Sequence, residues 1–345
     1  MIAKNINSLT KKELIKELEM LSAEHTALLK SARAILNNQD FETSAREIFN
    51  YCKNVTGATS GYIALLSPDG AENEVLFLDS GGRACIVDES LPMPIRGLRE
   101  TAYRTLKGVY DNSFTDSKWM QYMPEGHMRL DNVLFAPLII EKHAVGLIGL
   151  ANKENGFTQR DIVFVSALSD IAAVALRNSR NLETLRYVSF HDQLTGLYNR
   201  HYFANEMKRL QHSREYPITI ISVDLDNLKK VNDTRGHVEG DKYLQACATL
   251  FKDTLRNYDL LARIGGDEFA LVLNRTDRET GENIIERIKS NVEKYNQTHT
   301  ALPLSISMGL AVSENSDQPL EETFREADGL MYKEKLQRRA QEKKG

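Results

Sequence analysis

The sequence predicts an α+β protein of two domains joined by one long helix. The chain has 345 residues, which exceeds the length that a single hydrophobic core usually organises. Apolar residues make up 41% of it and charged residues 27%, a balance typical of folded globular domains. In both halves, segments with strand-like alternation are interleaved with segments of helical periodicity. Residues 158–190, between the halves, contain neither glycine nor proline.

Residues 1–38 are expected to form an N-terminal helix with an apolar seam. Its members recur at alternating spacings of four and three: Leu14, Leu18, Leu21, His25, Leu28, Ala32 and Ile35. Two arrangements would use such a seam. It could contact a second copy of the chain, or it could pack a single amphipathic helix on its own domain. The regular heptad spacing favours contact with a second copy.

The next domain, residues 39–178, is expected to contain an antiparallel sheet with flanking helices. A helix and two strands are predicted first, at 41–55, 60–67 and 74–80. Two further apolar runs, 132–140 and 144–152, are separated by only three polar or charged residues, which predicts an antiparallel hairpin.

A signalling helix is expected over 162–190, overlapping the end of this domain. Thr158 and Asp161, three residues apart, form a capping pattern that places the helix start near residue 158. The first half of the helix is apolar and the second half polar, so it would connect the two domains as a rigid lever. Heptad spacing along it predicts pairing with a second copy of the chain through Val165, Leu168, Ala172, Ala175, Ser179 and Leu182.

Residues 184–345 follow the order β-α-β-β-α-β with one added helix, the ferredoxin-like or split-βαβ pattern. The expected strands are 216–226, 260–265, 268–273 and 302–312, and the expected helices are 237–256, 278–296 and 319–340. In this topology the first strand lies in the centre of the sheet beside the hairpin. The end of that strand is therefore expected next to the turn at Gly265.

Two acids, Asp267 and Glu268, interrupt the apolar run LARIGGDEFALVL at 261–273. Burying unpaired carboxylates costs several kcal/mol, so the acids are expected at an open turn. Gly265 and Gly266 permit positive φ and so favour a tight turn between two strands.

The first strand of the same domain ends in the acidic sequence Asp224-Leu225-Asp226. Next to the hairpin, Asp224 and Asp267 can converge on one cation, and carboxylates, a main-chain carbonyl and phosphate oxygens are ligands that Mg²⁺ accepts. Lys229 follows the strand end, where it can meet phosphate. Asn232 and Asp241 flank a glycine-rich turn, and an amide beside a carboxylate suits a guanine edge.

Five motifs stand in order: DQLTGLYNR (192–200), DLDNLKKVNDTRGHVEGD (224–241), RNYD (256–259), RIGGDEF (263–269) and ADGLMYKEK (327–335). This part of the chain resembles the GGDEF domains, the diguanylate cyclases. The resemblance implies a nucleotide-cyclase palm fold and a homodimer that converts two GTP into cyclic di-GMP and two pyrophosphates. Two alternatives stay open: a catalytically silent domain that binds GTP or cyclic di-GMP, and a cyclase that also accepts ATP.

The resemblance also implies roles for individual residues. Asp224, the Leu225 carbonyl and Asp267 would hold Mg²⁺, for which Mn²⁺ can substitute, and Glu268 would assist the metal or deprotonate the attacking 3′-hydroxyl. The residues implied in catalysis are Lys229, Asp267 and Glu268. The residues implied in GTP binding are Leu194, Lys229, Asn232, His237, Asp241, Gly265, Gly266, Lys335 and Arg339.

Arg256 and Asp259 match the RxxD pattern of the same family. The resemblance implies an inhibitory site at which the product cyclic di-GMP binds. The alternative from the residues alone is a surface ion pair at a helix end, which would contribute little to stability.

The N-terminal domain resembles a GAF domain over residues 135–176, which implies a small-molecule ligand that the sequence does not identify. Four residues match a signature of cyclic-nucleotide-binding members, but Ile162 replaces its final glutamate; these are Asn152, Lys153, Phe157 and Asp161. We therefore expect a structural role for them. His127 and His143 could ligate haem or a metal, but no second ligand is paired with them.

The overall composition excludes several classes. A net charge of −4 gives no nucleic-acid-binding footprint, and three unspaced cysteines indicate neither a disulfide framework nor a zinc site. The N-terminus lacks the apolar core of a signal peptide, and no apolar run is expected to reach the roughly 18 residues of a membrane span. A cytoplasmic protein without membrane contact is expected.

Overall fold

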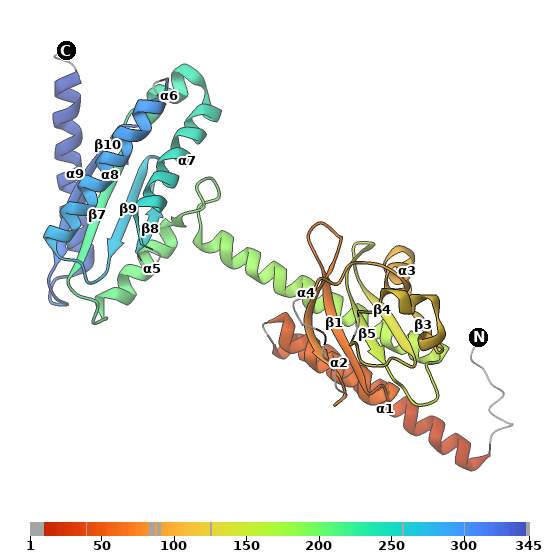
Figure 1. Cartoon of the computed structure of the whole chain (residues 1–345). Helices are drawn as coiled ribbons and strands as arrows, with labels where there is room; N and C mark the ends of the chain where they lie inside the picture. The colour runs from red at the N-terminus through yellow and green to blue at the C-terminus, as the bar shows by residue number, and fades with distance from the viewer. Residues whose placement is uncertain are drawn as a thin grey trace. The chain divides into compact units, whose positions relative to one another are not determined.

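The computed structural model describes residues 10–38, 40–82, 87, 91–124, 126–256, 259–299 and 301–342. The chain divides into two compact units, Met1–Leu182 and Glu183–Gly345 (Figure 1). Each unit contains one five-stranded sheet with helices against it, so the predicted α+β class is confirmed.

The sheet of the first unit is antiparallel, with the strand order β2-β1-β5-β4-β3. Its strands are β1 (Ser60–Leu66), β2 (Asn73–Asp79), β3 (Val109–Asp111), β4 (Val133–Ile140) and β5 (His143–Ala151). The predicted hairpin is confirmed as β4 and β5, paired from Val133↔Ala151 to Ile140↔His143. Its tight turn places Glu141 and Lys142 at positive φ.

Helices cover both faces of this sheet. Against one face pack α1 (Lys11–Asn37), α2 (Phe41–Thr56) and α4 (Gln159–Phe190), which contribute most of the larger apolar core (Figure 1). The other face is covered by α3 (Leu98–Thr105) and two short 3₁₀ turns, η2 (Phe114–Asp116) and η3 (Lys118–Tyr122), around a smaller apolar cluster.

Helix α1 packs on its own domain partly through the predicted seam, because Leu28 and Ile35 are partly buried against the larger apolar core. Ala27, Ser31 and Ala34 are buried, whereas Leu14, Leu18 and Leu21 of the seam are 37%, 59% and 49% exposed. Packing within the domain therefore uses the second half of the seam and leaves Leu14, Leu18 and Leu21 uncovered. Its contact with a second copy remains a prediction.

Helix α4 begins as predicted, because Thr158 and Asp161 cap each other's amides, and it ends at Phe190. The prediction that its heptad seam pairs with a second copy is wrong. The seam members from Val165 to Ser179 are buried in the domain core, and only Leu182 is exposed. Heptad spacing marks an apolar face, and here the sheet covers that face.

By length and composition alone, α4 contains an 18-residue window that could cross a membrane. The sequence analysis did not predict this window. Half of that window is buried inside the structure, so its apolar side chains serve the core of the first unit.

The sheet of the second unit has the strand order β10-β7-β9-β8-β6. Its strands are β6 (Tyr198–Asn199), β7 (Ile218–Leu225), β8 (Leu260–Arg263), β9 (Glu268–Leu273) and β10 (Ile306–Ser313). Its helices are α5 (Arg200–Gln211), α6 (Leu228–Arg235), α7 (His237–Thr254), α8 (Arg278–Thr298) and α9 (Leu320–Glu342). The predicted β-α-β-β-α-β order is confirmed, with β6 and α5 added before it and α6 inserted after β7.

Alternation along β7 assigns its side chains to two layers. Ile221, Val223 and Leu225 enter the core beneath α7 and α8, whereas Ile218 and Ile220 pack on the side of α5 and α9 (Figure 1). Asp224 therefore lies on the α9 side, because successive strand residues face opposite ways. α9 lies directly on β10, because a Cβ at Gly309 would come within 2.1 Å of α9 main-chain atoms.

Candidate active site

The adjacent ends of β7 and β9 bring the predicted acids together. Asp224 is paired with Glu268 across the two antiparallel strands, and Leu225 donates its amide hydrogen to the Asp267 carbonyl at 2.8 Å. The prediction that the first strand of the domain lies beside the hairpin is confirmed. Three carboxylates, from the end of β7, the start of β9 and the turn before β9, therefore lie at the same end of the sheet.

The hairpin turn differs from the expected geometry, because neither Gly265 nor Gly266 has a positive φ. The amides of Ile264 and Gly265 donate to the Glu268 carbonyl at 2.9 and 3.3 Å. A Cβ at Gly265 would lie 2.3 Å from Glu268 Oε2, whereas one at Gly266 would meet no atom within 4 Å. Glycine at 265 therefore gives the Glu268 side chain room to approach, and the turn places no backbone strain on it.

The acids create a strongly negative and partly desolvated site. Burial raises the pKa of Asp224, and the charge of Asp267 adds to this, while a hydrogen bond from Lys335 acts in the opposite direction. Burial also raises the pKa of Glu268, assisted by the charges of Asp267, Asp224 and Asp328. Lys335 Nζ lies 2.5 Å from Asp224 Oδ2 and is the cation in contact with this carboxylate.

The site fits a divalent cation in its donor chemistry. Asp224 is only 4% exposed, and its Oδ1 is buried without a hydrogen-bond partner. Within the described ranges, no three His, Cys, Asp or Glu side chains form a preassembled metal site. The Leu225 carbonyl and oxygens of a ligand would therefore have to complete the shell around Asp224 and Asp267, as hard-cation sites in nucleotide enzymes commonly require.

A surface hollow of about 370 Å³ opens beside these acids. Its lining residues are Asn227, Leu228, Lys229, Lys230, Asp233, Asp267, Lys335 and Arg339. The structure thus brings four predicted residues together around one space, two of them on α9 at positions four apart. Lys230 and Asp233 were missed, although both stand on α6 beside residues that the motif identified. Three lysines and one arginine around this space suit a polyphosphate.

The predicted guanine-binding residues lie where α6 meets α7. A Cβ at Gly240 would lie 1.8 Å from Asn232 Oδ1, so the Asn232 side-chain amide packs directly against α7 next to Asp241. His237 is exposed at the start of α7. Leu194 is partly buried against the apolar core and does not line the hollow. Its contact with GTP stays a prediction.

A connection between the start of the second unit and the acidic turn was not predicted. Arg263 Nη1 donates to Asp192 Oδ1 at 3.1 Å, and its Nη2 and Nε donate to the Gly266 carbonyl at 2.7 and 3.2 Å. Arg263 and Asp192 are 13% and 24% exposed, so this contact is largely shielded from water. Both residues stand in quoted motifs, but the sequence could not show that they meet.

We expect the Arg263→Lys variant to lose about tenfold in turnover. A lysine ammonium group lacks the planar guanidinium that donates to the Asp192 carboxylate and the Gly266 carbonyl at the same time. Arg275→Lys is the matched control, since Arg275 forms an exposed pair with Glu215 away from the acids. Steady-state kinetics of both variants would measure the difference. Equal rates for Arg263→Lys and Arg275→Lys would show that the Asp192 contact does not position the turn.

Asp226 is a further residue whose structural role was not predicted. It is 8% exposed and accepts hydrogen bonds from Ser305 Oγ at 3.0 Å and from Ser307 Oγ at 3.1 Å. These bonds fasten the start of β10 to the end of β7, which fixes the backbone on which Asp224 stands.

Arg256 and Asp259 lie together in the turn before β8. The Arg256 amide donates to Asp259 Oδ2 at 3.0 Å, and the Asp259 amide donates to the Arg256 carbonyl at 3.0 Å. The Asp259 carboxylate therefore caps a turn. Arg256 is exposed at its surface, and burial raises the pKa of Asp259.

In the first unit, the residues matching the cyclic-nucleotide signature support the fold. Lys153 Nζ contacts Asp161 Oδ2 at 2.5 Å, and Asn152 is 5% exposed with its amide bonded to neighbouring main chain. His127 Nδ1 contacts the Met128 carbonyl, and His143 is exposed at the hairpin turn.

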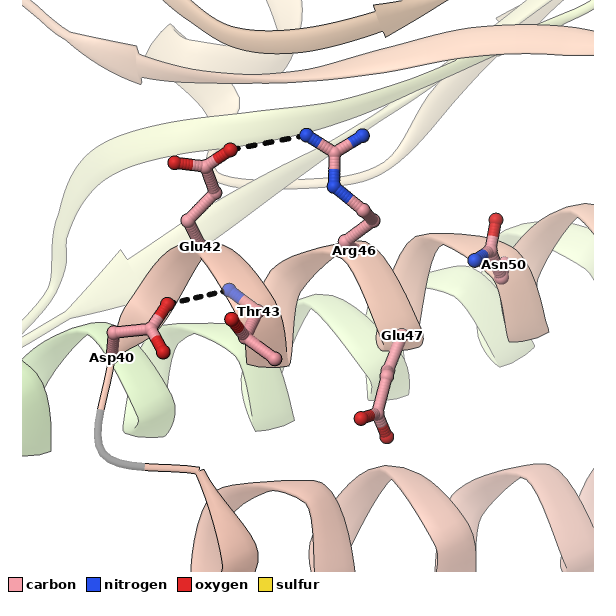
Figure 2. A pocket seen from close by; sticks show the side chains of 6 residues that line it. All are labelled: Asp40, Glu42, Thr43, Arg46, Glu47 and Asn50. Atoms are coloured by element: carbon pink, nitrogen blue, oxygen red, sulfur yellow. Dashed lines mark hydrogen bonds and ion pairs between the residues drawn. The ribbon is translucent and has the colours of Figure 1, made fainter.

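A second hollow, on the surface of α2, contains none of the predicted residues (Figure 2). Four of its polar residues already interact with one another. Asp40 accepts from the Thr43 amide at 2.8 Å as an N-cap, and Arg46 pairs with Glu42 at 3.0 Å.

Comparison with known proteins gives two family matches. The model described as "Diguanylate cyclase, GGDEF domain" matches residues 189–341, and the GAF domain model matches residues 38–177.

Similar curated proteins include three named diguanylate cyclases. The chain is 32% identical over 184 residues to the probable diguanylate cyclase DgcT of Escherichia coli K12, covering 52% of this chain and 41% of that protein. It is 28% identical over 212 residues to diguanylate cyclase A of Treponema denticola, covering 58% and 56%. It is 34% identical over 159 residues to diguanylate cyclase DgcM of E. coli K12, covering 44% and 38%. The match spans less than two thirds of each of these relatives.

Similar solved structures include the coiled coil and GGDEF domain of DgcB from Caulobacter crescentus in complex with c-di-GMP. The identity is 25% and the TM-score 0.44, with 49% of this chain and 92% of that chain covered. Diguanylate cyclase SiaD from Pseudomonas aeruginosa, in complex with its activator SiaC, is 25% identical with a TM-score of 0.40, covering 52% and 70%.

Proposed function

The chain carries a GGDEF domain of the diguanylate cyclase family behind a GAF domain, and we propose on this basis that it condenses two GTP into cyclic di-GMP with release of two pyrophosphates. One observation carries the proposal most strongly. The carboxylates of Asp224, Asp267 and Glu268 stand on paired strand ends beside a hollow lined by cationic side chains.

The proposed metal is Mg²⁺, for which Mn²⁺ can substitute. Asp224, the Leu225 carbonyl and Asp267 would hold it, with Glu268 assisting, and the buried unpaired Oδ1 of Asp224 supports this assignment. Once bound, the ion would neutralise negative charge on phosphate oxygens.

The cationic side chains around the hollow are proposed to bind the triphosphate. Lys229 follows the end of β7, while Lys335 and Arg339 stand one turn apart on α9. Lys335 contacts Asp224 in the structure, so a bound nucleotide would offer it phosphate oxygens in place of this carboxylate. Asn232 and Asp241 are proposed to bind the guanine edge, which favours GTP over ATP.

The chemistry requires two domains facing each other. Each 3′-oxygen attacks the α-phosphorus of the opposite GTP, a new P–O bond forms, and the bond to pyrophosphate breaks. Glu268 is proposed to accept the 3′-hydroxyl proton, and burial supports this by raising the pKa of Glu268. Because one domain holds one GTP, the complete site needs a C₂ dimer, for which the exposed first half of the α1 seam is one candidate surface.

The proposal is tested by incubating the purified full chain with GTP and Mg²⁺ and separating the products by mass spectrometry. We expect cyclic di-GMP and pyrophosphate in a ratio of one to two, and little product from ATP. Binding of GTP without any turnover, at concentrations where the protein is dimeric, would favour a silent receptor instead.

Product feedback is proposed at Arg256 and Asp259, and regulation by a GAF-domain ligand is proposed in addition. We expect Arg256→Ala to remove the slowing of the reaction as cyclic di-GMP accumulates, because the site loses its guanidinium. Full progress curves with added cyclic di-GMP would measure this. Wild-type curvature in the variant would contradict the inhibitory site without affecting the proposed synthesis.

A further inference from the structure

Polar side chains are packed among apolar ones on the α3-covered face of the first sheet. They come from β1 (Tyr62), β2 (Asn73) and α3 (Arg99 and Tyr103). Tyr62 and Tyr103 pack against the smaller apolar cluster of this unit, which includes Phe135. None of these polar residues belongs to the motifs identified in the sequence.

Two hydrogen-bond donors in this group are buried without a partner. Asn73 is 5% exposed, and its Oδ1 accepts from the Tyr103 hydroxyl at 2.5 Å, but its Nδ2 donates to nothing. Arg99 Nη1 is likewise buried without a hydrogen bond, while Nη2 reaches the Pro94 carbonyl at 3.4 Å. Each buried donor left unpaired costs about 1–3 kcal/mol, so the pair of donors indicates a missing acceptor.

Arg99 also brings a positive charge into this cluster. In the parts of the chain that the structure describes, no carboxylate forms an ion pair with this guanidinium. Burial raises the pKa of Tyr62 and of Tyr103, and the charge of Arg99 opposes both rises; at Tyr62 a side-chain hydrogen bond with Arg99 acts in the same direction as this charge. A cation surrounded by apolar groups and neutral hydroxyls favours an anion beside it.

We propose that this cluster, Tyr62, Asn73, Arg99 and Tyr103, binds a small carboxylate, with Arg99 Nη1 and Asn73 Nδ2 as the donors. One positive charge and two unpaired donors match the single charge and two oxygens of a carboxylate. A phosphate dianion would need further cations. The apolar cluster beside the donors suits the carbon body of an organic acid.

The site can be followed through the only tryptophan of the chain, Trp119, which packs against the same apolar cluster. The full-length protein is titrated with sodium propionate, sodium acetate, sodium phosphate and sodium chloride at constant ionic strength while Trp119 fluorescence is recorded. We expect a saturable change with both carboxylates, tighter for propionate, and none with chloride. Tighter binding of phosphate than of propionate, or no saturable signal with any carboxylate, would overturn the assignment.

Two variants assign the signal to the cluster. Arg99→Gln is expected to weaken propionate binding about tenfold or more, because a charge-assisted bond is lost. Arg104→Gln is the matched control, since Arg104 lies on the same helix but is exposed, and it should bind like the unchanged protein. Equal affinities in the two variants would overturn the proposal.

Asn73→Asp gives an independent readout that does not need a ligand. This change adds a carboxylate to the cluster that contains Arg99, so we expect a higher unfolding temperature of the first unit and no response of Trp119 to propionate. If Arg99 already has its charge balanced, the new buried acid would instead lower the unfolding temperature, which would contradict the proposal. None of these measurements depends on cyclase activity.

Discussion

Replacing Glu268 by glutamine is expected to lower the rate of cyclic di-GMP formation by about three orders of magnitude. The variant keeps the size of the side chain but loses the carboxylate that is proposed to assist the metal and accept the proton. The loss should appear in kcat more than in the KM for GTP, because the proposed phosphate and guanine contacts come from α6, α7 and α9. Steady-state kinetics at saturating Mg²⁺ would measure both constants.

Glu282→Gln provides the matched control. Glu282 is exposed on α8, and the same chemical change there should leave the rate unaltered. Glu268→Gln should also keep its unfolding temperature, since the change relieves repulsion between Glu268, Asp267 and Asp224. A rate within a few-fold of the unchanged protein would remove Glu268 from the proposed chemistry.

The sequence predicted the part of the site that depends on local pattern. Motif order placed Asp224 at a strand end and Asp267 at a hairpin turn, and the split-βαβ topology requires those strands to be neighbours. The strand ends and the position of the hairpin turn could be predicted because the backbone hydrogen bonds that define them are local, although neither glycine of the turn adopts the expected positive φ.

Contacts that depend on packing between distant elements could not be predicted. Lys335 meets Asp224 only because α9 lies directly on β10 at Gly309, and nothing in either motif specifies that distance. The contact of Arg263 with Asp192 likewise joins two motifs 71 positions apart. The prediction that the α4 seam contacts a second copy was wrong for a related reason. Heptad spacing identifies an apolar face but not the surface that covers it.

Lys335→Met is expected to produce the second large effect, a loss of about a hundredfold in turnover, because a donor to the transferring phosphates is removed. The same variant should destabilise the metal-free protein by about 3 kcal/mol, since removing one partner of a buried ion pair leaves Asp224 without its cation. Lys335 is 14% and Asp224 6% exposed in this pair, so water can replace little of the lost contact.

Mg²⁺ separates these two consequences. Without Lys335, a cation at Asp224 meets no competing ammonium group, so added Mg²⁺ should raise the unfolding temperature of Lys335→Met more than that of the unchanged protein. Turnover should nevertheless remain low, because the metal cannot replace the contact of Lys335 with phosphate. Lys333→Met, which alters an exposed lysine on the same helix, should change neither property.

The combined measurement decides what Lys335 does in the protein. A larger Mg²⁺ response together with low turnover would mean that Lys335 balances Asp224 before the metal and nucleotide bind and then contacts phosphate. An unaltered Mg²⁺ response with low turnover would confine the residue to substrate binding. Normal turnover would contradict the phosphate contact itself, and the cationic hollow would then have to bind GTP through Lys229, Lys230 and Arg339.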